Sequence, residues 1–207
     1  MSWLALLDFA SVVVFALTGA LVASRAQLDL VGFAFVACLT AVGGGTVRDV
    51  VLDRNPVFWV GEPLYIFIAA AAAVVVFFTA HLMESRYRWL LWLDSFALAV
   101  AVPAGVSAGL AMEQTLPVVV IMGMVTGCFG GLMRDVVCNE VPLVLKQGEL
   151  YATAAFMGAL AAVAVVAVEG GVGLALMVCA GVTWVLRAGS MALGWRLPVY
   201  KGRPPQV

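Results

Sequence analysis

Long apolar stretches alternate with short polar connections along this chain of 207 residues. A membrane-spanning helix needs roughly 20 predominantly apolar residues. Seven stretches come close to that length, at residues 3–23, 30–51, 63–83, 91–111, 116–137, 148–168 and 171–192. Because the connections between them are short, the pattern predicts an all-α integral membrane protein with a single membrane domain over residues 1–207.

The composition agrees with a lipid environment. Hydrophobic residues make up 64% of the chain and charged residues only 11%, whereas a soluble domain has about 45–50% and about 25%. The net charge is −1 and there is no long run of like charge, so a nucleic-acid partner is not expected. The four cysteines form no CxxC pair, so neither a metal site nor a disulfide framework is predicted.

Basic residues between the spans predict the orientation, because cytoplasmic loops carry an excess of lysine and arginine. With the N-terminus outside, only Arg54 falls on the outer side, and Arg48 and Arg134 lie within spans. The predicted topology is therefore seven spans with the N-terminus out and the C-terminus in. The inner side then holds Arg25, Arg86, Arg88, Lys146, Arg187, Arg196, Lys201 and Arg203.

One motif occurs twice. Residues 44–51 (GGTVRDVV) return at 130–137 (GGLMRDVV), 86 residues later. The same offset relates further pairs, among them Asp8 and Asp94, Gly19 and Gly105, Thr40 and Thr126, Pro56 and Pro142, and Tyr65 and Tyr151. The chain therefore contains two related halves, residues 3–83 (helices 1–3) and 91–168 (helices 4–6), followed by an extra seventh helix at 171–192.

Each half contains three spans, so the second copy enters the membrane from the opposite side. The halves are then related by a pseudo-two-fold axis in the membrane plane, as in folds that place their working site at discontinuous helices near the midplane. Here the candidate broken helices are spans two and five, because their glycines lower backbone rigidity. The glycines are Gly43, Gly44, Gly45, Gly130 and Gly131. Close packing between helices is the alternative reason for them.

Four charges follow these glycines inside the predicted spans: Arg48, Asp49, Arg134 and Asp135. A charge at mid-membrane costs roughly 2.5–3.5 kcal/mol, so four unpaired charges would cost on the order of 10 kcal/mol. Adjacent helical residues point about 100° apart, so an arginine is not expected to pair with the aspartate beside it. Across the axis, Arg48 is predicted to pair with Asp135, and Arg134 with Asp49. The charges either fix the two halves together or line and gate an aqueous path.

Other polar residues have two interpretations each. Thr40 and Thr126 lie one turn before the glycines, where their hydroxyls either bond back to their own helices or line a pore. Asp8 and Asp94 begin the first span of each half, where they either favour a helix N-terminus or form a cation-attracting mouth. Lys146 lies on the inner side and is explained by the positive-inside bias or by a contact with anionic lipid.

Signatures of an enzyme are missing from the sequence. It has no phosphate-binding loop of the Walker type, and its single histidine cannot build a Ser/His/Asp set or a metal cluster. The protein is therefore not expected to be an enzyme or a primary pump.

Seven spans, two inverted three-helix halves and a glycine cluster followed by Arg-Asp in spans two and five resemble the trimeric intracellular cation (TRIC) channels, specifically their prokaryotic members. Bacterial relatives of these channels have also been described as glycine transporters. The resemblance covers residues 3–192. It is carried by GGGTVRD at 43–49 and GGLMRD at 130–135. The second motif lacks a full glycine triplet, because Phe129 stands where the first motif has Gly43.

The resemblance implies a homotrimer with one pore inside each subunit, in the inner membrane of a prokaryote. It implies conduction of monovalent cations, chiefly potassium with some sodium, with no cofactor beyond the permeant ion and a bound lipid. The five glycines become the pore kinks, and the pore or gate groups are Thr40, Arg48, Asp49, Thr126, Arg134 and Asp135. A secondary transporter of glycine or another small amino acid, working by alternating access, is the alternative.

Overall fold

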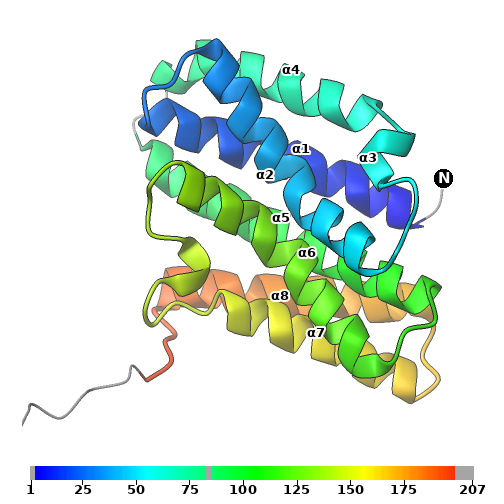
Figure 1. Cartoon of the computed structure of the whole chain (residues 1–207). Coiled ribbons are helices and arrows are strands. Elements are labelled where there is room, and N and C mark those ends of the chain that lie inside the picture. Colours follow the sequence, from blue (N-terminus) through cyan, green and yellow to red (C-terminus); the bar gives the residue numbers. More distant parts are fainter. Residues whose placement is uncertain (1–2, 83–84, 199–207) are drawn as a thin grey trace, which may run out of the picture.

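The computed structural model describes residues 3–82 and 85–198, and the part of the chain that it describes is helical (Figure 1). The helices are α1 (Trp3–Arg25), α2 (Leu30–Val51), α3 (Phe58–Gly61), α4 (Leu64–Thr79), η1 (Ala80–Leu82), α5 (Arg86–Ala111), α6 (Leu116–Val137), η2 (Leu143–Leu145), α7 (Ala152–Ala167) and α8 (Val172–Leu193). The predicted all-α fold is confirmed.

Six helical segments are long and apolar enough to cross a bilayer, with α4 and η1 forming one of them over Leu64–Leu82. The helix α7 has only 16 residues and is not extended in this way. The sixth predicted span, 148–168, is therefore a shorter helix, because residues 148–151 are not helical and α7 starts only at Ala152. At the other extreme, α5 begins five residues before the predicted span and continues through Pro103. Its first turn holds Arg86 and Arg88, so the apolar pattern alone misses this polar start.

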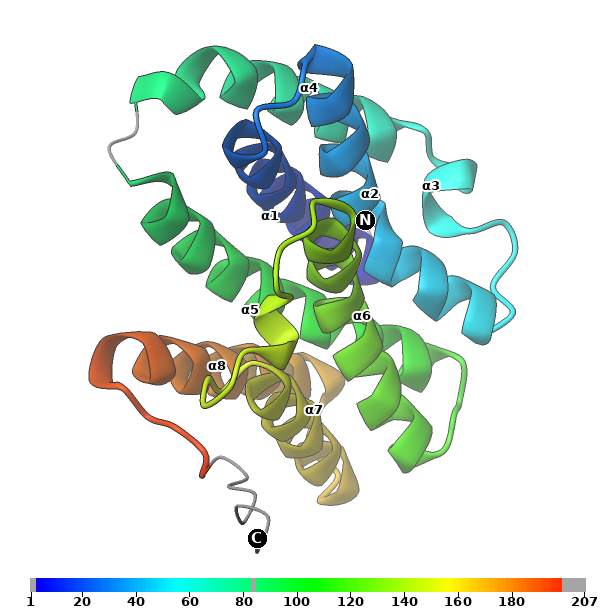
Figure 2. The ribbon, with the colours of Figure 1, turned by 60° about the vertical axis from the view of Figure 1, so that its left-hand side comes forward.

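The halves pack through equivalent helices. One half is built by α1, α2 and α4, and the other by α5, α6 and α7 (Figure 2). The interface between them consists mainly of α1 against α5 and α2 against α6. Each of these contacts joins a helix to its own repeat partner, which is the arrangement expected around a two-fold axis. The extra helix α8 packs on α5 and α7, so it covers only the second half.

Small residues allow the helices to approach closely. Ala69 and Ala73 of α4 and Ala155 and Ala159 of α7 are fully buried, as expected where membrane helices pack through small side chains. Large apolar side chains face outward instead, such as Phe67 of α4, which is 70% exposed. A soluble protein would bury these side chains, so this outer surface fits contact with lipid or with another subunit.

Three contacts bring most of the predicted inner loops to one end of the molecule. Arg25 pairs with Glu140 at 3.2 Å, Arg86 Nη1 donates to the carbonyl of Ser24, and Lys146 Nζ donates to the hydroxyl of Tyr87. Arg187 departs from the prediction, because it is a fully buried residue of α8 rather than a solvated loop charge. The grouping is as the topology requires, and which end faces the cytoplasm stays a prediction.

Candidate functional site

The helices α2 and α6 touch through their backbones at the centre of the molecule. A Cβ atom on Gly44 would overlap the carbonyl oxygen of Thr126, and one on Gly130 would overlap the carbonyl oxygen of Thr40. The two contacts are related by the 86-residue offset, so this crossing lies on the pseudo-two-fold axis. Only glycine permits so close an approach, which makes close packing one role of the doubled motif.

Both helices continue through their glycines without interruption, from Leu30 to Val51 and from Leu116 to Val137. The expectation that they are discontinuous here is wrong, because the close contact between two regular helices needs no release of backbone hydrogen bonds. A role of the glycines as kinks of a conduction pore stays a prediction.

The two threonines of the crossing bond back to their own helices. The Thr40 hydroxyl donates to the carbonyl of Val36 at 2.6 Å, and the Thr126 hydroxyl to that of Met122 at 2.7 Å. Each hydroxyl also lies against a glycine of the neighbouring helix, Gly19 or Gly105. The hydroxyls are thus satisfied by the packed structure, and pore lining by these residues remains untested.

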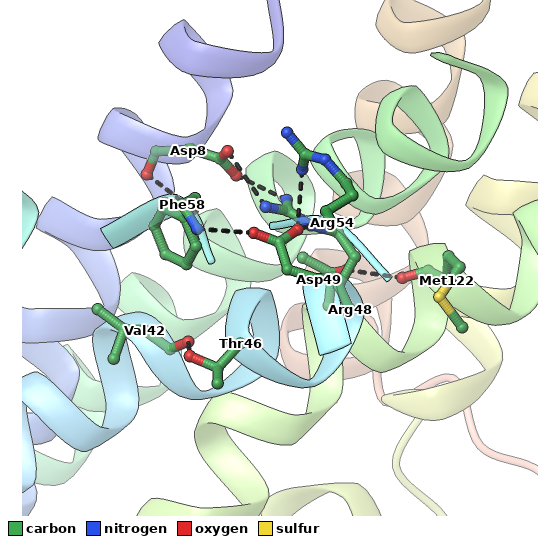
Figure 3. A network of polar contacts seen from close by, with 10 residues as sticks. Asp8, Val42, Thr46, Arg48, Asp49, Arg54, Phe58 and Met122 are labelled. Atoms are coloured by element: carbon green, nitrogen blue, oxygen red, sulfur yellow. Dashed lines mark hydrogen bonds and ion pairs between the residues drawn. The ribbon is translucent and has the colours of Figure 1, made fainter. Parts of the chain in front are cut away.

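The first ion-pair cluster consists of Asp8, Arg48 and Asp49 (Figure 3). Arg48 Nη1 and Nη2 donate to the two carboxylate oxygens of Asp8 at 2.7 and 3.3 Å, and Nε donates to Asp49 at 2.8 Å. Arg48 and Asp49 are fully buried, and Asp8 is 4% exposed. Every nitrogen of the guanidinium group therefore has a carboxylate partner, the arrangement in which a buried arginine is best stabilised.

Two further residues complete this first cluster from the segment after α2. Arg54 Nη1 donates to Asp49 Oδ1 at 2.8 Å, and the backbone amide of Phe58 donates to Asp49 Oδ2 at 2.9 Å (Figure 3). The Phe58 ring lies 5.4 Å from the Arg48 guanidinium and packs against Tyr65, which also stacks on Phe9. Two arginines thus balance two aspartates inside an aromatic surround.

The second ion-pair cluster consists of Asp94, Arg134 and Asp135, and repeats the first. Arg134 Nη1 donates to Asp94 at 2.8 Å and Nε donates to Asp135 at 2.7 Å. The amide of Leu143 donates to the other oxygen of Asp135, as the Phe58 amide does to Asp49. Arg134 Nη1 also donates to the Thr18 hydroxyl of α1, which ties this cluster to the other half.

These distances correct three predictions. Arg48 pairs with Asp8 and Arg134 with Asp94, so pairing across the axis with Asp135 and Asp49 is wrong. Each arginine also bonds the aspartate beside it, because the long side chain folds back along the helix so that Nε reaches the neighbouring carboxylate. Asp8 and Asp94 are internal residues of α1 and α5, where they balance a buried arginine instead of capping a helix.

The two clusters differ in what surrounds them. Arg134 Nη2 is buried and lacks a hydrogen-bond partner among the described residues, whereas the Asp94 carboxylate interacts with the Tyr151 hydroxyl as well as with Arg134. The buried hydroxyl of Ser95 also lacks a partner among the described residues, and Ser95 occupies the repeat position of Phe9. No basic residue replaces Arg54, since that repeat position holds Glu140, which pairs with Arg25. Two aspartates therefore share one arginine, which leaves one excess negative charge.

Lys146 and Arg187 extend the second half toward the same end. Lys146 Nζ donates to the Tyr87 hydroxyl at 2.6 Å. The guanidinium carbon of Arg25 lies over the same ring, 4.7 Å from its centroid. Arg187 donates to Glu149 at 2.8 Å and lies 5.1 Å from the Tyr151 ring. Sequence reasoning missed Arg187, Arg54 and Thr18 as parts of the site, since none of them repeats at the 86-residue offset.

The arrangement defines a class of protein: a multi-pass membrane protein built from two inverted three-helix repeats, with a charged cluster in each. A family model described as Glycine transporter matches the chain twice, over residues 5–81 and 91–167. The two matched segments begin 86 residues apart, which is the offset of the doubled motif. The chain belongs to this family.

Relatives by sequence agree with that assignment. A UPF0126 membrane protein of Vibrio cholerae is 34% identical over 200 residues, which cover 96% of this chain and 83% of that protein. The UPF0126 inner membrane protein YadS of Escherichia coli is 38% identical over 153 residues, 73% of each chain. The protein is thus a multi-pass inner-membrane protein.

Solved structures share the fold. The TRIC trimeric intracellular cation channel orthologue from Rhodobacter sphaeroides has 41% sequence identity and a TM-score of 0.90, and the match covers 94% of this chain and all of that one. A second TRIC cation channel has 30% identity and a TM-score of 0.86, with 96% and 98% covered. The predicted resemblance to the TRIC family is confirmed, and it places the chain among non-enzymatic channels or transporters.

Proposed function

We propose that this protein is a monovalent cation channel, permeable chiefly to potassium with some sodium, with a pore in each subunit between α2 and α6. The observation that carries the proposal is the central crossing of these helices, flanked by a charged cluster on either side. In this proposal the path is closed where Gly44 contacts Thr126 and Gly130 contacts Thr40, since the backbones touch there, and a small separation of the two helices opens it.

The sign of the charge favours cations. The first cluster is neutral once Arg54 is included, and the second has two aspartates for one arginine. In a low-dielectric surround, an excess carboxylate attracts a cation and raises the barrier for an anion. Two solved relatives with 41% and 30% identity are described as cation channels, which favours the same sign of charge.

We further propose a homotrimer. The solved relative from Rhodobacter sphaeroides is described as trimeric, and α4 and α8 of this chain expose large apolar side chains that a partner or lipid can cover. Chemical crosslinking of the purified protein in mild detergent tests this state. A ladder ending at three subunits is expected, and a ladder that ends at two contradicts it.

Single-channel recording in a planar bilayer tests conduction. In asymmetric KCl we expect unitary currents whose reversal potential approaches that of potassium. The position of the pore is tested with Met133→Cys, since Met133 packs against Gly43 between the two helices. A charged thiol reagent should reduce the current of Met133→Cys. The control is Phe67→Cys on the outer surface, and an equal reduction in both variants would place the pore elsewhere.

The description of the family favours one alternative, a secondary transporter of glycine or a similar amino acid. Inverted repeats also serve alternating access, in which one half rocks against the other. Proteoliposomes loaded with glycine separate the two functions. Saturable exchange of labelled glycine without unitary currents would replace the channel proposal, whereas currents without exchange would exclude the transporter.

A further inference from the structure

A hollow of about 190 Å³ lies where α1 ends, α2 begins and α4 gives way to α5. It is at the end of the molecule where the loop between α1 and α2 lies (Figure 1), remote from the crossing of α2 and α6. Its polar wall consists of Ser24, Gln27, His81 and Arg86, and its apolar wall includes Phe33 and Phe77. Neither ion-pair cluster contributes to it.

The positively charged group of this hollow is the Arg86 guanidinium, which is fixed by hydrogen bonds. Arg86 Nε donates to the carbonyl of Ala80 at 3.2 Å, and Nη1 donates to the Ser24 carbonyl at 3.2 Å and hydroxyl at 3.0 Å. The guanidinium group is thus anchored to the ends of α1 and α4 at once. A fixed guanidinium loses little entropy when it binds a phosphate or carboxylate group.

The charge of Arg86 is not balanced by a carboxylate in the part of the chain that the structure describes. Its basic neighbours have other partners, because Arg25 pairs with Glu140 and Lys146 bonds Tyr87. The Asp29 carboxylate, in the nearby loop, accepts a hydrogen bond from the backbone amide of Gly32 at the start of α2. Among residues 3–82 and 85–198, the hollow therefore holds one oriented positive charge without a carboxylate partner, and the His81 imidazole lines the same wall.

The opposite wall suits a hydrocarbon. The rings of Phe33 and Phe77 meet edge to face at 5.0 Å, and Leu28 lies beside them, partly exposed. A volume of about 190 Å³ corresponds to roughly six water molecules at about 30 Å³ each. That is room for a phosphate and part of a glycerol group. The hollow lies at helix ends, the depth at which lipid headgroups meet protein.

We propose that this hollow binds the headgroup of an anionic phospholipid. The phosphate accepts hydrogen bonds from Arg86 and His81, Gln27 and Ser24 bond the glycerol part, and the first methylenes of an acyl chain lie against Phe33 and Phe77. Charge-assisted hydrogen bonds to phosphate supply the specificity, and basic side chains near the cytoplasmic leaflet add long-range attraction to anionic lipid. The site does not depend on whether the protein conducts ions.

Lipid binding is measured on the purified full chain in detergent, by titration of dioctanoyl-phosphatidylglycerol against the midpoint of thermal unfolding. Dioctanoyl-phosphatidylcholine and inorganic phosphate are titrated in parallel. We expect phosphatidylglycerol to stabilise the protein saturably and Arg86→Gln to weaken its affinity about tenfold, the effect of one lost charge-assisted hydrogen bond. Because Arg86 also anchors the backbone, His81→Gln and the hollow-filling Leu28→Trp provide independent variants, each expected to weaken binding.

The matched control is Arg88→Gln, an exposed arginine of the same helical turn that does not line the hollow. Its affinity for phosphatidylglycerol should stay within about twofold of the parent, since a single exposed charge contributes little. Equal effects of Arg86→Gln and Arg88→Gln would overturn the site in favour of diffuse surface attraction. Equal stabilisation by phosphatidylcholine, or saturation by inorganic phosphate alone, would overturn the anionic lipid as its occupant, as would unchanged affinity in both His81→Gln and Leu28→Trp.

Discussion

The two ion-pair clusters share a backbone plan and differ in how completely it is satisfied. In the first, Arg48 bonds both oxygens of Asp8 as well as Asp49, and Arg54 adds a second cation. In the second, Arg134 Nη2 has no hydrogen-bond partner among the described residues, and Glu140 stands where the first cluster has Arg54. The doubled sequence thus preserves the arginine and its two aspartates, while the residues around them have diverged.

The difference indicates unequal mechanical roles. The first cluster has little freedom to rearrange, because every guanidinium nitrogen of Arg48 bonds a carboxylate and the ring of Phe58 lies against that group. Unpaired groups in the second cluster can form other bonds or bind water at little cost, because they lose no existing partner. The first cluster therefore acts as an anchor between helices, and the second is the one that rearrangement affects first. Four comparisons between equivalent positions test this contrast.

Removal of the central arginine has the largest expected effect. Arg134→Leu leaves Asp94 and Asp135 without any cation, whereas Arg48→Leu leaves Asp49 still bonded to Arg54. Breaking a buried ion pair costs about 3–5 kcal/mol, and we expect Arg134→Leu to be the more damaging of the two. Thermal unfolding in dodecyl maltoside measures both, with Arg88→Leu as a control for the loss of an exposed arginine. A larger loss in Arg48→Leu would contradict the role assigned to Arg54.

The second comparison concerns Phe9 and Ser95, which occupy equivalent repeat positions beside the first and the second ion-pair cluster. Phe9→Ala removes a ring that stacks on Tyr65 at 4.2 Å, so we expect a loss of about 2–3 kcal/mol, somewhat below that of a fully buried phenylalanine. Ser95→Ala removes a buried hydroxyl that has no partner in the described structure, so stability should be unchanged or slightly higher. The same unfolding assay measures this pair, and a marked loss in Ser95→Ala would show that the hydroxyl is bonded.

The glycines next to the clusters should also respond unequally. A Cβ on Gly45 would lie 2.6 Å from the Phe58 ring, but one on Gly131 would lie 3.2 Å from the Tyr151 hydroxyl. Gly45→Ala is therefore expected to cost about 1–2 kcal/mol through overpacking. Gly131→Ala should be close to neutral, because a helix propensity gain of about 1 kcal/mol offsets the tighter contact. Equal unfolding midpoints for Gly45→Ala and Gly131→Ala would mean that the residues around the two clusters resist an added methyl group equally.

The smallest effects are expected at the outermost charges. Arg54→Gln removes one bond from buried Asp49 and should cost about 1 kcal/mol, since Arg54 itself is partly exposed. Glu140→Gln, at the equivalent repeat position, breaks only the half-exposed pair with Arg25 and should cost about 0–0.5 kcal/mol. Unfolding measured at increasing KCl separates the two variants further. The effect of Glu140→Gln should disappear at a lower KCl concentration than that of Arg54→Gln, because salt screens the more exposed pair more strongly. A larger loss of stability in Glu140→Gln than in Arg54→Gln would mean that the outer charge of the second half contributes more than that of the first.

Much of this organisation was predictable from the sequence. Apolar run lengths indicated the helices, since every backbone group in lipid must be bonded internally. The offset of 86 indicated two inverted halves, and the same offset had already paired Asp8 with Asp94. Their partners were not predictable, because a helix pattern does not say how far a long arginine side chain reaches. Arg48 and Asp8 are 40 residues apart, and only the packing of α1 on α2 brings them together.

By itself the sequence determined the helical class, the two-fold repeat and the presence of paired charges inside the spans, since these follow from hydrophobic length, spacing and the cost of unpaired charge in lipid. Tertiary structure alone decided that each arginine pairs with two aspartates of its own half, that Gly44 and Gly130 serve a backbone crossing, and that the second cluster lacks a counterpart of Arg54. Those outcomes depend on which helices pack together and on the residues beside the motif, such as Phe9 in the first half and Ser95 in the second, which the motif itself does not specify.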